Sequence, residues 1–406
     1  MSAHNDRLAR RNAFVLALAQ AMGGSLMSIT ISIGGLVGVY LLSSTGELAT
    51  LPVSMMIIGT ACGTIPAALI LGRLGRRPGF MLGAMLAGTG GIIAFTAIHL
   101  TSFPLFCVGT FIGGLSAAFV QQYRFAAAEG ASDTFRPKAI SFVLAGGMFA
   151  GVIGPQTVIA TKDLFAPVAF AGSYFAQAIL AIVTIGILLF YKPVTATGPI
   201  RQKSVADGGR PLRVILTQPK IMLAILCGVV SYSVMSLVMT AAPLAMLDCG
   251  FSTADAATGI QWHIISMFGP SFFTGTIISR FGAERVTAVG LVLLALAGTS
   301  SLLGITLGHF YTTLILLGLG WNFGFIGGTT MLTAAQRPEE RARTQAANDF
   351  IVFGSVAIAS LSSGVLFSTV GWASINWALL PLVAVPLAFI LLQSVSRTQS
   401  QQDRLA

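Results

Sequence analysis

The chain has 406 residues, of which 55% are hydrophobic and only 9% are charged, and its mean hydropathy is +0.85. Soluble domains carry roughly 25% charged residues, so this composition excludes a soluble protein and indicates a membrane protein. The net charge of +10 does not indicate a nucleic-acid partner, because the basic residues lie in short breaks between apolar runs.

The apolar runs are long enough to cross a membrane as helices. A spanning helix needs about 20 mostly apolar residues, and cutting the chain at its charged and Pro- or Gly-rich breaks leaves about twelve such runs. They cover residues 13–41, 48–72, 79–98, 103–128, 139–161, 167–191, 220–246, 256–279, 286–307, 310–334, 343–367 and 373–393. The runs alternate too poorly for barrel strands, so the sequence predicts an all-α membrane protein.

The N-terminus is basic, as in a secretory signal, but the first run continues to about Leu42 without a convincing cleavage site. We therefore expect an uncleaved first helix. The basic residues between the predicted spans lie in the loops on one side, and the loops on the opposite side hold only Lys162. This asymmetry predicts that both termini and the central loop are cytoplasmic. The basic residues on that side are Arg7, Arg10, Arg11, Arg73, Arg76, Arg77, Arg136, Lys138, Lys192, Arg201, Lys203, Arg210, Arg213, Lys220, Arg280, Arg285, Arg337, Arg341, Arg343, Arg397 and Arg404.

The predicted spans fall into two groups of six, separated by a polar stretch without apolar periodicity. We expect one six-helix bundle at 1–191, a cytoplasmic linker at 192–219 and a second bundle at 220–406. The four cysteines are scattered without paired or ligand-like spacing, so free thiols and no metal site are expected.

A basic loop between the second and third spans is echoed in the second half. The first copy runs from Gly72 to Phe80 and contains Arg73, Arg76 and Arg77; the second runs from Gly275 to Arg285 and contains Arg280. Self-similarity at a fixed offset suggests two related halves.

Together with the two groups of six spans, this pair of loops resembles the major facilitator superfamily over the whole chain. The resemblance implies two pseudo-symmetric six-helix halves and a gating role for Arg73, Arg76, Arg77 and Arg280. The sequence departs from the family loop at Ala68, Gly72 and Ser279, where the family has Gly, Asp and Asp.

Two further stretches bear on the direction of transport. The fifth span contains a Gly-rich stretch from Gly146 to Pro155 that partly resembles the family's antiporter motif. On the fourth span, the Arg of many proton-coupled exporters is replaced by Gly109. The first favours efflux slightly and the second disfavours proton antiport.

Ionisable residues inside a span are costly and are treated as site hypotheses. Arg124 lies near the end of the fourth span and Asp349 inside the eleventh, at similar depth. We expect them to pair across the halves as an inner gate, with Asp349 as the candidate for proton coupling; the alternative is an Arg124 that snorkels to the interface.

By family analogy, the remaining polar and aromatic residues of the inward-facing spans form the substrate site. Amides and aromatic rings outnumber charges among them, which suits a neutral, planar or amphipathic solute. The predicted substrate-binding residues are Gln20, Gln121, Tyr123, Gln156, Tyr232, Gln261, Trp262, His263, Trp321 and Asn322.

No phosphate-cradling loop is present, so neither an enzyme nor an ATPase is expected, and no cofactor. The sequence predicts a monomeric secondary transporter in the lipid of a bacterial inner membrane, working by alternating access, with protons as a candidate coupling ion. The first hypothesis for its cargo is uptake of a vitamin such as riboflavin, because the chain resembles small bacterial vitamin importers. The alternatives are proton-coupled efflux of amphipathic drugs and, from another class, a non-transporting membrane sensor.

Overall fold

The computed structural model describes residues 3–43, 47–129, 131–132, 135–193, 210–337 and 340–402, and the long elements in these ranges are all helices. They are α1 (Ala3–Leu42), α2 (Leu51–Leu74), α3 (Arg76–His99), α4 (Phe103–Val120), α5 (Tyr123–Ala128), α6 (Arg136–Thr161), α7 (Ala171–Leu188), α8 (Leu212–Leu216), α9 (Pro219–Asp248), α10 (Thr253–Phe268), α11 (Ser271–Phe281), α12 (Ala283–Leu303), α13 (Leu307–Ala335) and α14 (Arg341–Gln402). Residues 194–209 of the predicted linker lie outside the described ranges.

Within the described residues, 10 helices are long and apolar enough to cross a membrane. One of them, α14, has 62 residues and turns at Gly371, whose φ of 78° lies in the left-handed region that glycine tolerates. Counting α14 as two crossings, and α10 with α11 as one broken crossing, accounts for each of the predicted spans. The prediction of an all-α membrane protein is confirmed.

Two predicted spans are interrupted. The predicted eighth span breaks between α10 and α11 at Gly269 and Pro270, because proline has no N–H to continue the helical hydrogen bonding. The predicted fourth span breaks between α4 and α5, where the Gln122 N–H donates to the Phe119 carbonyl three residues back, at 3.0 Å. Both breaks place polar backbone within an apolar run.

Capping residues fix where two helices of the second half begin. The Ser252 hydroxyl accepts a hydrogen bond from the Asp255 N–H at 3.1 Å, and the Asp255 carboxylate accepts one from the Ser252 N–H at 3.0 Å, which forms a capping box at the start of α10. The Thr306 hydroxyl accepts from the His309 N–H at the start of α13.

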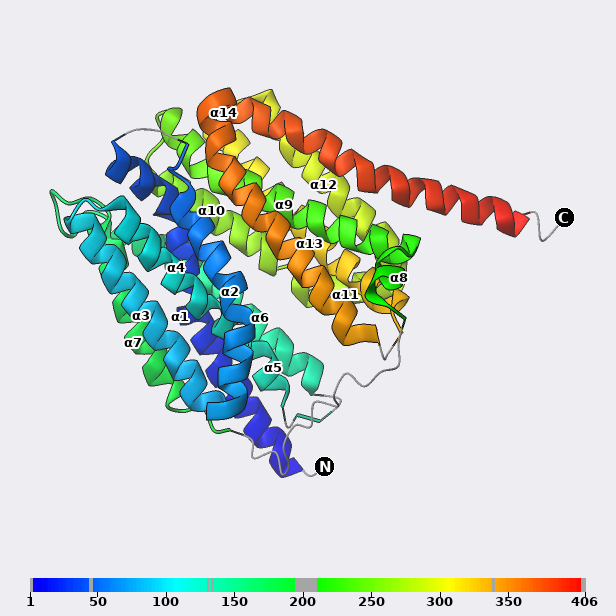
Figure 1. The fold of residues 1–406 in the computed structure, drawn as a ribbon, viewed down its shortest axis with the longest axis horizontal. Coiled ribbons are helices and arrows are strands. Elements are labelled where there is room, and N and C mark those ends of the chain that lie inside the picture. The colour runs from blue at the N-terminus through cyan, green and yellow to red at the C-terminus, as the bar shows by residue number, and fades with distance from the viewer. Residues whose placement is uncertain are drawn as a thin grey trace.

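Helices α1–α7 lie on one side of the molecule and α9–α14 on the other (Figure 1). Glycines allow close packing within each side. A Cβ at Gly59 of α2 would lie 2.2 Å from the Phe111 carbonyl oxygen, and one at Gly114 of α4 would lie 2.1 Å from the Met56 carbonyl oxygen. The α2 and α4 backbones are therefore in contact. Such close packing by small residues is expected in lipid, where no hydrophobic force drives helices together.

Candidate functional site

The two groups of helices meet firmly at one end of their interface. The Ser54 hydroxyl of α2 and the Ser360 hydroxyl of α14 share a hydrogen bond of 2.9 Å, and both serines are fully buried. One turn further along α14, a Cβ at Gly364 would lie 2.2 Å from the Thr50 Oγ1. We call this region the closed end; it also includes Gln156 of α6 and Gln261 of α10.

Helices α6 and α10 also meet across the closed end. The Gln156 Nε2 donates to the Gln261 Oε1 at 2.8 Å. Gly151 of α6 lies against Ile264, where an added Cβ would come within 2.4 Å of the isoleucine Cγ2. Neutral amides, hydroxyls and small residues therefore close this end.

At the opposite end, α2 and α14 diverge (Figure 1). Within residues 61–69 of α2, only Gly63 and Ala67 are buried. The antiparallel register set by Ser54 and Ser360 brings Ile65 level with the first turns of α14. There Ile65 is 71% exposed and Phe350 is 82% exposed. We call this region of α2, α5 and α14 the open end.

Aromatic rings from three helices of the second half gather near the open end. The Tyr232 ring of α9 makes edge contacts with Trp321 and Phe325 of α13 and with Phe353 of α14, at centroid distances of 5.3, 5.2 and 5.8 Å. Trp321 and Phe325 are stacked at 5.1 Å with an interplanar angle of 15°. Tyr232, Phe325 and Phe353 are partly exposed, so this aromatic cluster presents ring surface to a ligand.

Charged side chains adjoin the aromatic cluster from both groups of helices. Arg124 of α5 is exposed and lies within electrostatic range of Asp349 of α14 and of the Tyr232 hydroxyl. Asp349 is also exposed and accepts a hydrogen bond from the Asn348 Nδ2 at 3.1 Å. Asp349 and Phe353 are one helical turn apart on the same face. Among the described residues, Arg124 and Asp349 make no ion pair within 4.0 Å, and the Arg124 guanidinium lies over the Phe125 ring at 4.8 Å.

Several predicted binding residues lie elsewhere. Tyr123 is buried beside Phe80 at a centroid distance of 4.8 Å, within the first group of helices. His263 is buried, with its Nδ1 2.9 Å from the Leu314 carbonyl oxygen. Gln121 lies at the α4–α5 break, Gln20 lies beside Gly146 of α6, and Trp262 is 44% exposed.

Asn322 holds the broken crossing together. Its Nδ2 donates to the Met267 carbonyl at 2.8 Å and to the Ser271 hydroxyl at 2.7 Å, while its Oδ1 accepts from the Thr274 hydroxyl at 2.6 Å. These bonds join the Met267 carbonyl, before Pro270, to the Ser271 and Thr274 hydroxyls after it, so the Asn322 amide links the two sides of the break.

The predicted gating arginines do not act alike. Arg76 forms an ion pair with Glu129, which follows α5. Arg280 lies over the Phe281 ring at 5.3 Å, while Arg73 is exposed and Arg77 is partly exposed.

Sequence reasoning did not identify a second ion pair, between Arg210 before α8 and Glu340 before α14. Their Nε–Oε1 and Nη2–Oε2 distances are 2.7 and 2.8 Å, and the Glu340 side chain is fully buried. The partners are 130 residues apart in the chain, and no local pattern links them.

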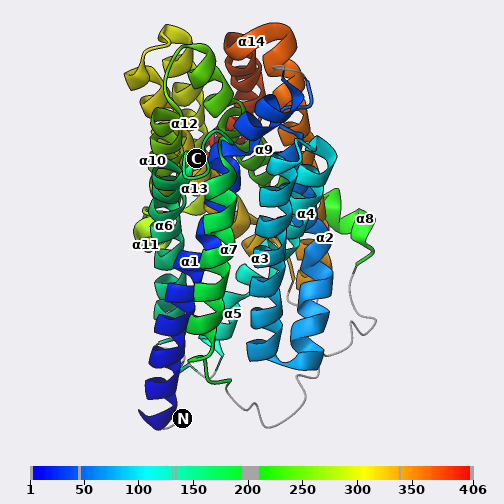
Figure 2. The same cartoon turned by 90° about the vertical axis from the view of Figure 1, so that its left-hand side faces the viewer.

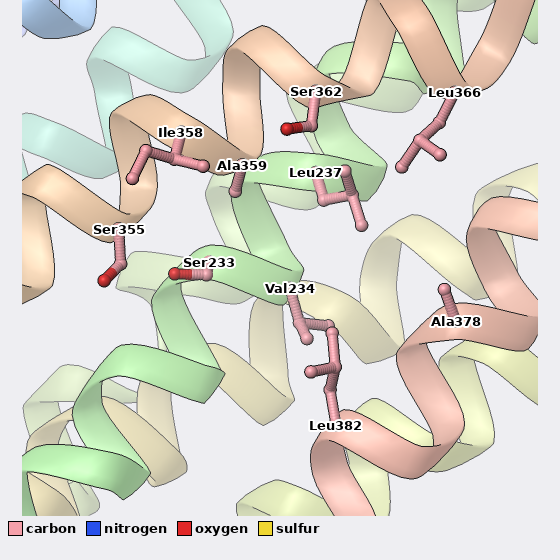
Figure 3. A pocket seen from close by; sticks show the side chains of 10 residues that line it. All are labelled: Ser233, Val234, Leu237, Ser355, Ile358, Ala359, Ser362, Leu366, Ala378 and Leu382. Atoms are coloured by element: carbon pink, nitrogen blue, oxygen red, sulfur yellow. The ribbon is translucent and has the colours of Figure 1, made fainter.

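A separate apolar pocket of ≈ 270 Å³ lies between α9 and the two arms of α14 (Figure 3). Its lining residues are Ser233, Val234, Leu237, Ser355, Ile358, Ala359, Ser362, Leu366, Ala378 and Leu382. On α14, these residues follow a different helical stripe from Asp349 and Phe353, so the pocket is distinct from the aromatic cluster.

Comparison with known proteins assigns the family. Residues 12–303 match the Major Facilitator Superfamily. The chain belongs to this superfamily. The solved structure of the nucleoside transporter NupG has the same fold, with a TM-score of 0.71 and 13% identity, covering 95% of this chain and 99% of the other.

Two relatives are similar over most of their length. The chain is 48% identical over 359 residues to the riboflavin transporter RfnT of Brucella anthropi, covering 88% of this chain and 89% of that protein. It is 28% identical over 378 residues to YddS of Bacillus subtilis, an uncharacterized MFS-type transporter, covering 89% and 86%. These relatives are transporters, so this member of the superfamily is a multi-pass membrane transporter and not an enzyme.

Proposed function

We propose that the protein takes up riboflavin by alternating access, with the aromatic cluster and the adjacent Arg124 and Asp349 as its binding site. The observation that carries the proposal is the 48% identity to a riboflavin transporter along nearly the full chain. The site chemistry supports it, because riboflavin is neutral and carries a large planar ring system. Such a ring gains about 1–3 kcal/mol from each aromatic side chain on which it stacks.

In the proposal, the protein is a monomer in the bacterial inner membrane with both termini in the cytoplasm. The conformation of the structure is then open toward the cytoplasm. The start of α1, the turn between α2 and α3, and α5 lie at one end of the molecule (Figure 2). Arg7, Arg10, Arg73 and Arg76 belong to these segments, whereas Lys162 follows α6 at the other end. Under the positive-inside rule, this distribution supports an open end in the cytoplasm and a closed end outside.

Transport then requires the two groups of helices to rock about the binding site. Opening the outer side breaks the Ser54–Ser360 and Gln156–Gln261 hydrogen bonds and separates Gly364 from Thr50. Closing the inner side brings the second half of α2 against the first turns of α14 and covers their exposed apolar side chains. A proton gradient is the proposed source of energy.

The test is uptake of labelled riboflavin by a bacterial host that lacks its own importer, with and without a proton uncoupler. We expect accumulation above that of cells with an empty vector, and loss of accumulation with the uncoupler. Persistence with the uncoupler would overturn proton coupling alone. No accumulation from protein that is present in the membrane would overturn riboflavin uptake, and a drug-sensitivity panel would then test export.

A further inference from the structure

The open end offers hydrogen-bonding groups of opposite kind next to the aromatic cluster. The Arg124 guanidinium only donates and the Asp349 carboxylate, when ionised, only accepts. Both side chains are exposed and lie within electrostatic range of one another without an ion pair. A ligand that stacks on the cluster and reaches both groups must present acceptors and a donor side by side on one edge.

We propose that Arg124 and Asp349 read the cyclic imide edge of the flavin ring, which makes them specificity-determining residues. This inference rests on the proposed function. The imide edge of riboflavin carries two carbonyl oxygens on either side of the N3–H group. The Asp349 carboxylate accepts from N3–H, and the Arg124 guanidinium donates to a neighbouring carbonyl oxygen.

The geometry supports this division of roles. Asp349 lies one helical turn from Phe353, whose ring contacts Tyr232, so the carboxylate and the aromatic cluster share one face of α14. Arg124, from α5, lies within electrostatic range of the Tyr232 hydroxyl. The stacking surface belongs to α9, α13 and α14 and the guanidinium to the first group of helices. The ligand therefore bridges the two groups.

Recognition of this kind assigns the ionised Asp349 to the ligand and not to proton coupling. If Asp349 were a coupling residue alone, Asp349→Asn would abolish uncoupler-sensitive accumulation and leave equilibrium binding and ligand discrimination unchanged. The two roles therefore predict different results from one variant.

The experiment measures equilibrium binding to the purified full chain by quenching of flavin fluorescence, with riboflavin and with riboflavin methylated at N3. Methylation removes the donor and leaves the ring otherwise intact. We expect the unmodified protein to bind riboflavin at least about tenfold more tightly than the methylated compound, as for loss of a hydrogen bond to a charged group. Asp349→Asn and Asp349→Ala should reduce that preference to about threefold or less, while Asp163→Asn, on an exposed loop, should retain it.

Arg124→Lys provides a second variant that keeps the positive charge. It should weaken riboflavin binding about three- to tenfold and leave the N3 preference in place, because a lysine cannot present the guanidinium fork. Equal binding of the two compounds by the unmodified protein would overturn the inference and leave riboflavin transport standing. Full N3 preference in both Asp349 variants would also overturn it. Absence of any riboflavin binding would overturn the inference together with the proposed function.

Discussion

The closed end and the open end of the interface use different chemistry. Neutral groups join the two groups of helices at the closed end, as in the Ser54–Ser360 and Gln156–Gln261 hydrogen bonds. Near the open end, the Arg76–Glu129 and Arg210–Glu340 ion pairs each connect elements of the same group. The difference indicates that opening the closed end requires only neutral hydrogen bonds and packing to break, whereas these ion pairs keep each group rigid as it moves.

The largest effect is expected where the closed end is packed most tightly. Gly364→Ala places a Cβ 2.2 Å from the Thr50 Oγ1 and 2.8 Å from the Glu47 carbonyl oxygen. Overpacking costs about 1–3 kcal/mol, which would lower the population of the closed state relative to the other states by about five- to 150-fold, so uptake should fall by about fivefold or more. Gly354→Ala on the same helix is the matched control, since no atom lies within 4 Å of its Cβ. Equal uptake by the two variants would show that tight packing at the closed end is not required for transport.

The next largest effect concerns the aromatic cluster. Tyr232→Ala removes a ring that contacts Trp321, Phe325 and Phe353, and we expect riboflavin affinity to fall by about ten- to hundredfold. Phe272→Ala, which removes a half-exposed ring of α11, is the control and should leave affinity unchanged. Flavin fluorescence titration measures both. A similar loss in the control would place the ligand elsewhere.

The ion pairs should matter for stability more than for binding. Hydrogen bonds from the Arg210 side chain lower the pKa of Glu340 from 4.5 to about 2. Because the folded pKa is depressed, the stabilisation is present above pH about 4.5 and is lost as the pH falls toward 2. Melting curves between pH 7 and pH 3 should show a steeper loss of Tm for the unmodified protein than for Glu340→Gln.

The two ion pairs also differ from one another. Arg210→Ala leaves a fully buried carboxylate without its partner, whereas Arg76→Ala affects a pair whose side chains are 23% and 32% exposed. We therefore expect the larger decrease in Tm at pH 7 from Arg210→Ala, and a cost of about 1 kcal/mol or less from Arg76→Ala. A larger decrease in Tm from Arg76→Ala than from Arg210→Ala would contradict a stabilising role for the buried Arg210–Glu340 pair.

An effect as small as that of Arg76→Ala is expected from the amide pair. Gln156→Ala, Gln261→Ala and the double variant form a cycle whose coupling should be about 0.5–1.5 kcal/mol, the value of one neutral hydrogen bond. The measurement is labelling of a cysteine introduced at Leu244, which packs against Gly35 across the closed end, in a chain without its native cysteines. Strictly additive effects would show that the amides act independently.

The fold could be predicted because the length of each apolar run sets the number of crossings. The break at Pro270 was not predicted, since proline alone does not decide whether a membrane helix kinks or separates. There was even less indication in the sequence of the break at Gln121 and Gln122, because neither glutamine disfavours a helix.

The binding site could be predicted only in part. Arg124 and Asp349 were singled out as a gating pair, with Asp349 as the coupling candidate, because charged residues in apolar runs are rare and costly, and their place in the binding site is a proposal. Phe325 and Phe353 were not, since phenylalanines are common throughout the chain and their role depends on the contact with Tyr232. Gln156 and Gln261 were expected to bind substrate, and their hydrogen bond to one another depends on how α6 meets α10.

The most direct measurement is exchange of labelled riboflavin by the purified chain in liposomes. The account predicts saturable exchange that unlabelled riboflavin inhibits, and a marked reduction in Tyr232→Ala with Phe272→Ala unaffected. Exchange no faster than in protein-free liposomes, from protein shown to be folded and inserted, would contradict riboflavin transport by this chain.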